Sequence, residues 1–319
     1  MRDLGVRLLQ LAVVFVVVTF FTVTLMSLVP GKPEVIVIPF DATPGQTQRQ
    51  QFREQNDLDK PLVVRWARWA GRFVTGNMGN LYSSTGTNPV SATVKSAAPI
   101  SALLILYTQL VALAVSIPLA IAAAYRNGRW VDKAISTMAF SFLSLPGFAV
   151  ALVLSYVFAV NLHWLPATGY SPPSDGLLLH FKSVVIPVFA LSLGQIAVYM
   201  RLLRSDLVAT LQEDFILMAK SKGISNRRVL WRHALRPSSL TLLTVVGLNV
   251  GNLIGGTIVV EALFSIPGMG MQIAAAILGR QYVALQSYVA IIAIFFVLLN
   301  FLVDYLYTVL DPRIRERTA

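Results

Sequence analysis

The chain of 319 residues contains no cysteine and only three histidines. Without cysteine it can form no disulfide, no thiolate nucleophile and no metal site with sulfur ligands. His163, His180 and His233 lie in or beside loops without metal-ligand spacing, and no His-Glu-x-x-His or Gly-x-Ser-x-Gly motif occurs. An intramembrane enzyme would need such a catalytic set within its spans, so the sequence argues against that class. We expect no catalytic residue and no bound metal.

A phosphate-binding loop is also missing. The only Gly-Lys pair, Gly31-Lys32, is followed by proline and lacks the upstream glycine spacing of such a loop. The chain is therefore not expected to hydrolyse a nucleotide or to hold a cofactor of its own. If it takes part in active transport, the energy has to come from another polypeptide.

Charged residues are scarce, at 13%, whereas hydrophobic residues make up 55% of the chain. This balance exceeds that of a soluble domain and is typical of a protein in a lipid bilayer. Because a helical span needs about 20 apolar residues, the chain has room for about six spans and for no soluble catalytic domain beside them. The net charge of +11 does not indicate nucleic-acid binding, because the basic residues lie in loops between apolar segments.

Six apolar stretches predict an all-α polytopic membrane protein with six transmembrane helices and an external region between the first two. The first stretch, about Val6 to Val29, is longer than a signal-peptide core, and no clean cleavage site follows it. We therefore expect a retained helix. The other stretches are about 99–124, 134–161, 184–203, 238–260 and 285–309.

The distribution of lysine and arginine predicts the orientation. The N-terminal tail, the loops 125–133 and 201–237 and the C-terminal tail hold 16 of the 26 basic residues. Eight of the other ten lie between Gly31 and Ser96, a segment long enough to be largely exempt from the positive-inside rule. Both termini are therefore expected in the cytoplasm, and an inverted topology is the alternative.

The external segment 31–98 contains an amphipathic pattern. Leu62, Trp66, Trp69 and Phe73 recur at three- and four-residue spacing, and arginines fall on another side. This pattern predicts a helix that either lies at the membrane interface, with its aromatic residues at headgroup depth, or packs onto the external ends of the spans. In both cases it forms a cap over the outer mouth.

The basic segment 201–237 predicts two short helices, one ending near Lys222 and one from about Asn226 to Leu235. Gly223 provides the stop signal between them, and Pro237 is expected to close the second helix and begin the next span. On the first helix Phe215, Met218, Ala219 and Lys222 are expected to share a face, which forms an apolar knob with a basic rim. Composition alone favours a solvated positive loop with no partner.

Two runs in this segment carry a resemblance: Asp214-Phe215 with Ala219-Lys220-Ser221-Lys222-Gly223-Ile224-Ser225, and Val229-Leu230-Trp231-Arg232-His233-Ala234-Leu235-Arg236-Pro237. They resemble the EAA loop of binding-protein-dependent ABC import permeases, and most closely the B-type branch of dipeptide and oligopeptide (peptide/nickel) permeases. Ala219 and Gly223 match the most characteristic Ala and Gly of that motif, whereas Leu217 and Met218 stand at its Glu-Ala-Ala core. The resemblance implies coupling helices that insert into a groove on an ATPase subunit.

Other segments extend the resemblance over nearly the whole chain. They are Asp57-Leu58-Asp59-Lys60-Pro61-Leu62, Gly76-Asn77-Met78-Gly79, Ser144-Leu145-Pro146-Gly147-Phe148, Trp164-Leu165-Pro166-Ala167-Thr168-Gly169, Glu261-Ala262-Leu263-Phe264-Ser265-Ile266-Pro267-Gly268-Met269-Gly270 and Leu310-Asp311-Pro312-Arg313-Ile314-Arg315. Asn77 stands where an aspartate is more usual in the family.

The resemblance implies a type I ABC importer permease in a prokaryotic plasma (inner) membrane. Its parts would be residues 1–30 with the first span, an extracytoplasmic cap region 31–98, a transmembrane domain 99–310 with its coupling loop at 205–237, and a tail 311–319. The implied partners are a second homologous permease, two ABC ATPase subunits that use ATP and Mg, an extracytoplasmic solute-binding protein and membrane lipid. The implied substrate is a di- or oligopeptide, and nickel, a metal chelate or another small solute is the alternative.

Within the spans, Gly247, Gly251 and Gly255 fall four residues apart and predict close helix packing. Asn249, Asn252 and Gly256 lie on an adjoining face that either lines the translocation path or forms hydrogen bonds between helices; the resemblance favours the path. Pro146-Gly147 predicts a break or kink, which could be static or a hinge.

Two acidic residues complete the candidates. Glu261 is expected at the external end of the fifth span, either solvated or paired with Arg280, and Asp304 is expected to pair with Arg201 or Arg204.

The candidate residues fall into three groups. Coupling to the ATPase is expected of Glu213, Asp214, Phe215, Met218, Ala219, Lys220, Lys222, Gly223 and Ile224. The translocation path is expected to include Pro146, Asn249, Asn252 and Gly256. Contact with the solute-binding protein is expected of Trp66, Trp69, Asn77 and Glu261.

Overall fold

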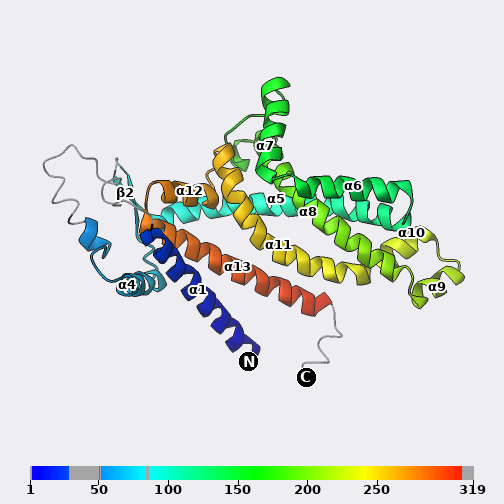
Figure 1. The fold of residues 1–319 in the computed structure, drawn as a ribbon, viewed down its shortest axis with the longest axis horizontal. Helices are drawn as coiled ribbons and strands as arrows, with labels where there is room; N and C mark the ends of the chain where they lie inside the picture. The colour runs from blue at the N-terminus through cyan, green and yellow to red at the C-terminus, as the bar shows by residue number, and fades with distance from the viewer. Residues whose placement is uncertain (1, 29–49, 51, 84–85, 311–319) are drawn as a thin grey trace. The chain divides into compact units, whose positions relative to one another are not determined.

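The fold was analysed in a computed structural model, which describes residues 2–28, 50, 52–83 and 86–310 (Figure 1). The chain divides into two compact units. The first unit contains residues 1–101 and 266–298, and the second contains residues 102–265 and 299–319. The early part of the external segment, 31–49, and the motif after Leu310 lie outside the described residues.

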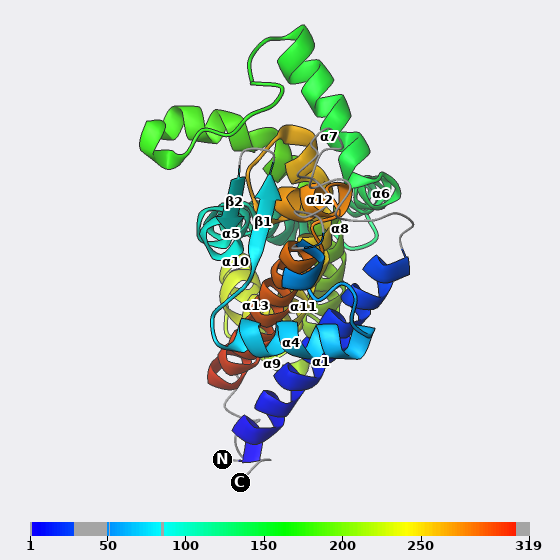
Figure 2. The ribbon, with the colours of Figure 1, turned by 90° about the vertical axis from the view of Figure 1, so that its left-hand side faces the viewer.

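The first unit contains one whole span, parts of two others and two shorter helices. Helix α1 (Arg2–Leu28) contacts α4 (Leu62–Val74), which lies across it in Figure 2. Strands β1 (Asn80–Ser83) and β2 (Gly86–Pro89) form an antiparallel hairpin with Asn80 opposite Pro89. The start of α5 (Val90–Tyr125), the short helix α12 (Met269–Leu278) and most of α13 (Tyr282–Leu310) complete this unit.

The second unit is organised around α8 (Leu177–Thr210), the most deeply buried of the long helices. Helices α6 (Trp130–Ser144), α7 (Gly147–Ser155) and α11 (Leu235–Phe264) all pack on it. The unit also contains the short helices η1 (Tyr156–Asn161), η2 (Pro173–Asp175), α9 (Asp214–Ser221), α10 (Asn226–Arg228) and η3 (Val229–Ala234).

The predicted six-span, all-α architecture is confirmed. Within the described residues, five helices are long and apolar enough to cross a membrane, and the bent pair Trp130–Ser144 and Gly147–Asn161 passes the same test when it is taken as one broken span, the sixth. Several helices exceed the predicted apolar stretches: α5 begins at Val90 rather than near residue 99, for example. Hydropathy marks only the part of a helix that fits the hydrocarbon, whereas the hydrogen-bonded helix continues into the polar layers.

The predicted break at Pro146 is confirmed and is large, since the two helices that meet there are bent by 96° (Figure 1). Leu145 and Pro146 both have extended backbone, with ψ of 126° and 131°. A residue before proline disfavours the helical region, and proline has no N–H for the helix that precedes it. The Pro146 carbonyl then accepts hydrogen bonds from the N–H groups of Ala149 and Val150, which begins α7.

The helix after Gly223 corrects one prediction. Pro237 does not end a separate helix, because α10, η3 and α11 follow one another as a continuous helix from Asn226 to Phe264. Residues Val229–Ala234 form π-helical turns just before the proline. A proline near the start of a helical segment removes a donor, and wider turns before it accommodate the lost hydrogen bond.

Candidate coupling segment and membrane sites

Helix α9 and Gly223 form a capped helix–turn. Gly223 has φ of +75°, a conformation that favours glycine. The Ile224 N–H donates to the Ala219 carbonyl at 3.2 Å, and the Gly223 N–H donates to the Lys220 carbonyl at 2.9 Å. This is the hydrogen-bond pattern of a Schellman cap, in which glycine ends a helix by turning left-handed. The bend that the sequence predicts at Gly223 is therefore present.

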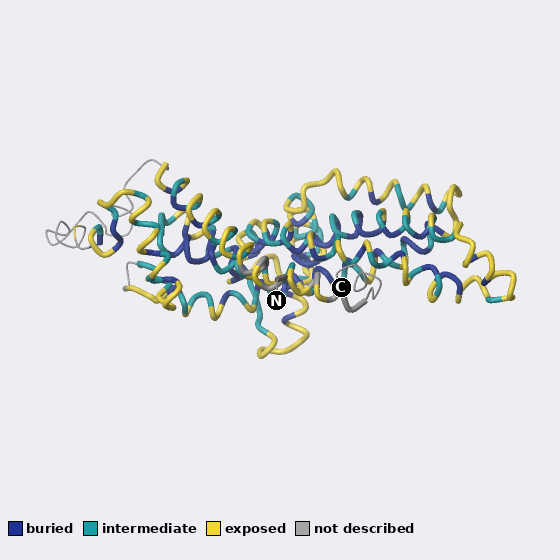
Figure 3. Tube along the Cα trace, turned by 90° about the horizontal axis from the view of Figure 1, so that it is seen from below, coloured by how far each residue is buried: buried dark blue, intermediate teal, exposed yellow. Residues whose placement is uncertain are grey.

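The two faces of α9 differ from the prediction. Ile216 is fully buried and Ala219 is 7% exposed, whereas Phe215, Leu217 and Met218 are 47%, 52% and 60% exposed. The expectation that Ala219 shares an exposed face with Phe215 and Met218 is wrong. Ile216 and Ala219, three residues apart, form the inner face, and the exposed apolar surface gains Leu217 instead. In Figure 3, α9 lies at the right-hand end of the tube, and most of that end is coloured as exposed.

The inner face of α9 is anchored in the main core of the second unit. Ile216 and Ala219 belong to one buried cluster with residues of η3, α5 and α8, namely Val229, Leu230, Ala120, Ile121, Ala124, Leu203 and Leu207. Burial of Ile216 alone stabilises this seating by about 1.5–3 kcal/mol. The small Ala219 lets α9 approach the ends of these helices closely. The inner face of α9 therefore shares one buried core with residues of η3, α5 and α8.

The charged residues of α9 lie at its ends. Glu213 precedes the helix in extended conformation, and Asp214 stands in the first turn, where a carboxylate interacts favourably with the helix dipole. Lys220 and Lys222 stand in or after the last turn, where positive charge is favoured for the same reason. All four are exposed. They surround the apolar surface formed by Phe215, Leu217 and Met218, which we call the α9 surface.

An ion pair beside this segment was missed by the sequence. Arg204 Nε and Nη2 donate to the two carboxylate oxygens of Asp132 at 2.5 and 2.6 Å. Asp132, only 4% exposed, also accepts the Gly128 N–H at 2.9 Å, and Arg204 reaches Asn127 at 3.0 Å. The pair ties the loop between α5 and α6 to α8. The only sign of this ion pair in the sequence is a single acidic residue, Asp132, at the start of an apolar helix.

Arg204, which was a candidate partner for Asp304, is therefore paired with Asp132 instead. The other candidate, Arg201, lies over the Phe140 ring at 4.5 Å from its centroid. The side chain of Asp304 lies outside the described residues.

The two asparagines of α11 hydrogen-bond to each other within the helix, and Asn249 lies beside a polar pair on α8 and α5. Asn252 Nδ2 donates to Asn249 Oδ1 at 3.0 Å, and Asn249 lies close to Tyr199 of α8. Tyr199 in turn donates to Gln109 of α5 at 2.9 Å. Asn249 is half-buried in this network, whereas Asn252 is exposed.

The glycine of α11 that lies closest to a neighbouring helix is not one of those predicted from the spacing. A Cβ at Gly256 would lie 3.3 Å from Leu191 of α8, so the close helix approach is at Gly256, which was assigned to the path. A Cβ at Gly255 would meet nothing within 4 Å, so the predicted packing at Gly255 is wrong in the described chain. Gly247 is buried, as close packing requires, and Gly251 is half-buried. Proximity of α8 rather than four-residue spacing decides which glycine is needed.

The aromatic residues of α4 pack on helices of the first unit. Trp69 is 2% exposed and its Nε1 donates to Ser287 at 3.1 Å, while Trp66 Nε1 donates to Thr19 at 3.0 Å. Phe73 completes a buried cluster with Trp69. The interpretation that the helix packs onto the spans is the one that the structure supports. Trp69 is therefore wrongly assigned to solute-binding-protein contact.

The other two candidates for that contact differ from each other. Asn77 is exposed, and its Oδ1 accepts the Gly79 N–H at 3.0 Å within a turn. Glu261 is fully buried in α11, so it is neither a solvated helix-end carboxylate nor a surface for a partner protein. The charge made it look exposed in the sequence, but the surrounding helices exclude water from it.

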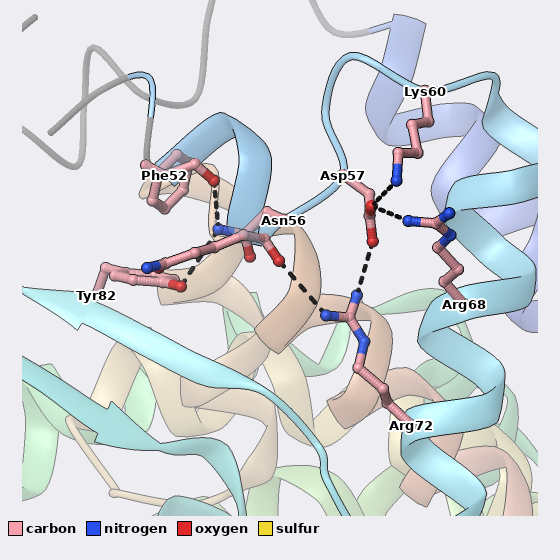
Figure 4. A network of polar contacts seen from close by, with 8 residues as sticks. Phe52, Asn56, Asp57, Lys60, Arg68, Arg72 and Tyr82 are labelled. Atoms are coloured by element: carbon pink, nitrogen blue, oxygen red, sulfur yellow. Dashed lines mark hydrogen bonds and ion pairs between the residues drawn. The ribbon is translucent and has the colours of Figure 1, made fainter. Parts of the chain in front are cut away.

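A buried carboxylate organises the turn before α4 (Figure 4). Asp57, with φ of +54° and 7% exposure, binds Lys60 at 2.9 Å, Arg68 at 2.8 Å and Arg72 at 3.3 Å. Burial opposes ionisation of Asp57, but the hydrogen bonds from Lys60 and Arg68 outweigh it and lower its pKa below the ordinary value. Nearby, Asn56 Nδ2 donates to the Phe52 carbonyl at 2.8 Å. The sequence motif contained Asp57, but its role was not predicted.

These observations define a class of protein. A polytopic helical membrane protein exposes a short capped helix whose inner face is seated on the ends of two spans, and among the described residues no cluster of His, Cys, Asp and Glu could hold a metal ion. The class that they define is a multi-pass membrane protein built of helices.

Comparison with known proteins then gives the family. Residues 116–316 match the family described as binding-protein-dependent transport system inner membrane component. The chain is 33% identical over 309 residues to a protein of Brucella abortus (strain 2308) named as a peptide transport system permease, with 97% of each chain covered. It is also 33% identical to a peptide ABC transporter permease of Sinorhizobium fredii over 311 residues, again with 97% of each chain covered.

A third relative is a nickel import system permease of Staphylococcus aureus (strain USA300). It is 33% identical over 310 residues, which cover 97% of this chain and 90% of the relative. The chain therefore belongs to the family of inner-membrane permeases of binding-protein-dependent ABC transport systems.

Proposed function

We propose that this permease imports di- or oligopeptides into the cytoplasm. It would do so with a second homologous permease, two ABC ATPase subunits and an extracytoplasmic solute-binding protein. ATP and Mg would be used by the ATPase subunits, and this chain would hold no cofactor. The peptide substrate is supported by relatives of the same length named as peptide permeases.

The observation that supports the coupling role is the construction of α9. Its inner face, Ile216 and Ala219, is buried in the core, while the α9 surface exposes three large apolar side chains. A contiguous exposed apolar surface on a rigid support is typical of a protein–protein contact. Acidic and basic residues at its two ends would fix the orientation of the partner.

In the proposed mechanism, closure of the ATPase subunits displaces α9, which moves together with the ends of α5 and α8. The bend at Pro146 would let α6 and α7 move differently from each other. Substrate released by the binding protein would pass along the exposed Asn252 of α11. The permease would supply shape change and no bond chemistry.

The proposed coupling role requires one orientation of the chain in the membrane. The α9 surface has to face the cytoplasm, where ATP is available, so both termini would also be cytoplasmic. The cap helix α4 and the β1–β2 hairpin would then face the solute-binding protein, with the exposed Asn77 as a candidate contact.

Nickel is the second candidate substrate, because the Staphylococcus aureus relatives are named as nickel permeases. Uptake of labelled dipeptide and of labelled nickel should be measured in cells with and without this chain. We expect the chain to be required for dipeptide uptake, and unlabelled di- and oligopeptides to compete. Uptake of nickel that depends on this chain and that peptides do not reduce would contradict the peptide proposal.

A further inference from the structure

Three arginines and a tryptophan surround an open cleft at the start of the long helix that continues into α11. The cleft has a volume of about 570 Å³ and is lined by Ser225, Arg227, Arg228, Trp231 and Arg232. Its arginines are exposed, and Trp231 is 50% exposed. The result is a shallow, open and positively charged surface along one helix, with one aromatic side chain beside the arginines. We call it the Arg–Trp cleft.

The positive charge of this cleft is not compensated within the described chain. None of its three arginines forms a salt bridge there, whereas Arg204, for example, is held by Asp132. From Ser225 to Pro237 the sequence contains no acidic residue. Like charges around one hollow repel one another, so an anion in the cleft would be favoured.

The position along the helix indicates which anion is available. The continuous helix Asn226–Phe264 has 39 residues, or about 58 Å at 1.5 Å per residue, against about 30 Å of hydrocarbon. From Pro237 to Val260 it has no charged residue, so the hydrocarbon boundary falls near Pro237. Trp231 precedes this boundary by about 9 Å of helix, so its backbone lies at the outer edge of a headgroup layer about 5–8 Å thick, and its indole ring can reach into that layer.

We propose that the Arg–Trp cleft binds the headgroup of an anionic phospholipid. Guanidinium groups donate paired N–H bonds to phosphate oxygens, and the Ser225 hydroxyl provides a further donor. Tryptophan prefers the membrane interface, where its ring meets the upper acyl chain and its N–H meets water. A basic cluster directly beside a span is typical of anionic-lipid recognition. This proposal depends neither on the substrate nor on the coupling role.

An acidic surface of a partner subunit could also neutralise these arginines. The half-exposed Trp231 favours the lipid, because an indole beside a span is stabilised at the headgroup layer without any partner. The α9 surface presents three large exposed apolar side chains, Phe215, Leu217 and Met218, whereas the cleft presents one, Trp231.

Quenching of tryptophan fluorescence by brominated lipid tests the proposal. The transporter complex is reconstituted in phosphatidylcholine vesicles that contain a minor fraction of either brominated phosphatidylglycerol or brominated phosphatidylcholine. We expect stronger quenching by the brominated phosphatidylglycerol, and loss of that excess in Trp231→Phe. Replacement of all three cleft arginines by glutamine should reduce the preference by more than tenfold, since each arginine near an anionic surface contributes about fivefold.

The matched control is the triple variant Arg126→Gln, Arg129→Gln and Lys133→Gln, which removes the same charge from the neighbouring α5–α6 loop and the first turn of α6. It should keep the preference for phosphatidylglycerol. Equal quenching by both lipids in the wild type, or equal loss in the control, would overturn the proposal. So would loss of ATPase co-purification in the cleft variant with unchanged quenching, because that result would identify a subunit contact. Single Arg228→Gln gives a milder test if the triple variant does not accumulate.

Discussion

At the scale of single residues, Gly223 is needed for its backbone conformation and not for the space around it. A Cβ at this position would meet no atom within 4 Å, yet φ is +75°. An L-residue in this left-handed region costs about 1–2 kcal/mol, except for asparagine, whose short side chain tolerates it better. The function of Gly223 is thus to end α9 in one geometry and to direct the chain into the helix that begins at Asn226.

Gly223→Val should therefore weaken coupling while Gly223→Asn largely preserves it. The valine variant is expected to insert normally but to lose most solute uptake and solute-stimulated ATP hydrolysis. Uptake assays in cells and ATPase assays of the reconstituted complex would measure this. If the valine variant transports at the wild-type rate, the turn at Gly223 is not part of the coupling mechanism.

Asp57 has a different kind of importance, because one carboxylate binds three basic side chains (Figure 4). Its lowered pKa means that folding favours its ionised form. That contribution is present above the ordinary carboxyl pKa of 3.8 and is lost as the pH falls through the lowered value. Part of the stability of the cap should consequently disappear in acid.

Asp57→Asn should destabilise the cap by about 2 kcal/mol at neutral pH, an estimate reduced for the exposure of the arginines. The apparent melting temperature of the purified protein should fall at pH 7, and its decrease between pH 5 and strongly acidic solution should become smaller than in the wild type. If the melting temperature of the Asp57→Asn variant depended on pH in the same way as that of the wild type, ionised Asp57 would not be a source of stability in the cap.

At the scale of elements, the Asp132–Arg204 pair joins the α5–α6 loop to α8 beside the seated α9. A buried ion pair need not stabilise a fold, but loss of one partner leaves the other uncompensated, at a cost of about 3–5 kcal/mol. Since Arg204 keeps 27% of its side chain exposed, the lower end of this range applies. The pair holds the α5–α6 loop and the start of α6 against α8.

Asp132→Asn is expected to lower the number of solutes imported per ATP hydrolysed, whereas the exchange Asp132→Arg with Arg204→Asp should restore it in part. The ratio of uptake to ATP hydrolysis in proteoliposomes separates this role from simple stability, which would reduce both rates together. Failure of the exchange, with both single variants fully coupled, would contradict a positioning role.

Element boundaries show what hydropathy can and cannot predict. The predicted amphipathic helix at Leu62–Phe73 is close to the observed α4, because its three- and four-residue spacing is a local property. The π-helical turns at Val229–Ala234 were not predicted, since an adjacent proline and the packing of Val229 and Leu230 against the core determine them together. Helix α12 was missed because its ten residues are too short to signal a span.

At the scale of the whole molecule, the proposed function predicts which side of the membrane each loop occupies. The absence of cysteine is useful here, because single cysteines can be introduced without background labelling. With a membrane-impermeant maleimide on intact cells, Thr87→Cys in the exposed part of β2 should be labelled and Ser225→Cys should not. After permeabilisation both should react. The opposite result in intact cells would invert the proposed topology and remove the coupling role.

The sequence by itself determined the membrane class, the number of spans, the break at Pro146 and the turn at Gly223. Each depends on the local composition or on a proline or glycine with its special backbone freedom. Such features can be predicted without knowing which residues are in contact in the fold. Membership of the permease family also follows from residues along the chain.

Only the tertiary structure decided which polar and small residues are buried and what they contact. Ala219 and Trp69 face protein rather than a partner, Glu261 is enclosed, and Gly256 rather than Gly255 meets a neighbouring helix. Helical periodicity assigns residues to faces, but in a membrane protein apolar residues can face either lipid or protein. The packing of α8 against its neighbours resolves that ambiguity, which is why the seat of the coupling helix was visible only in three dimensions.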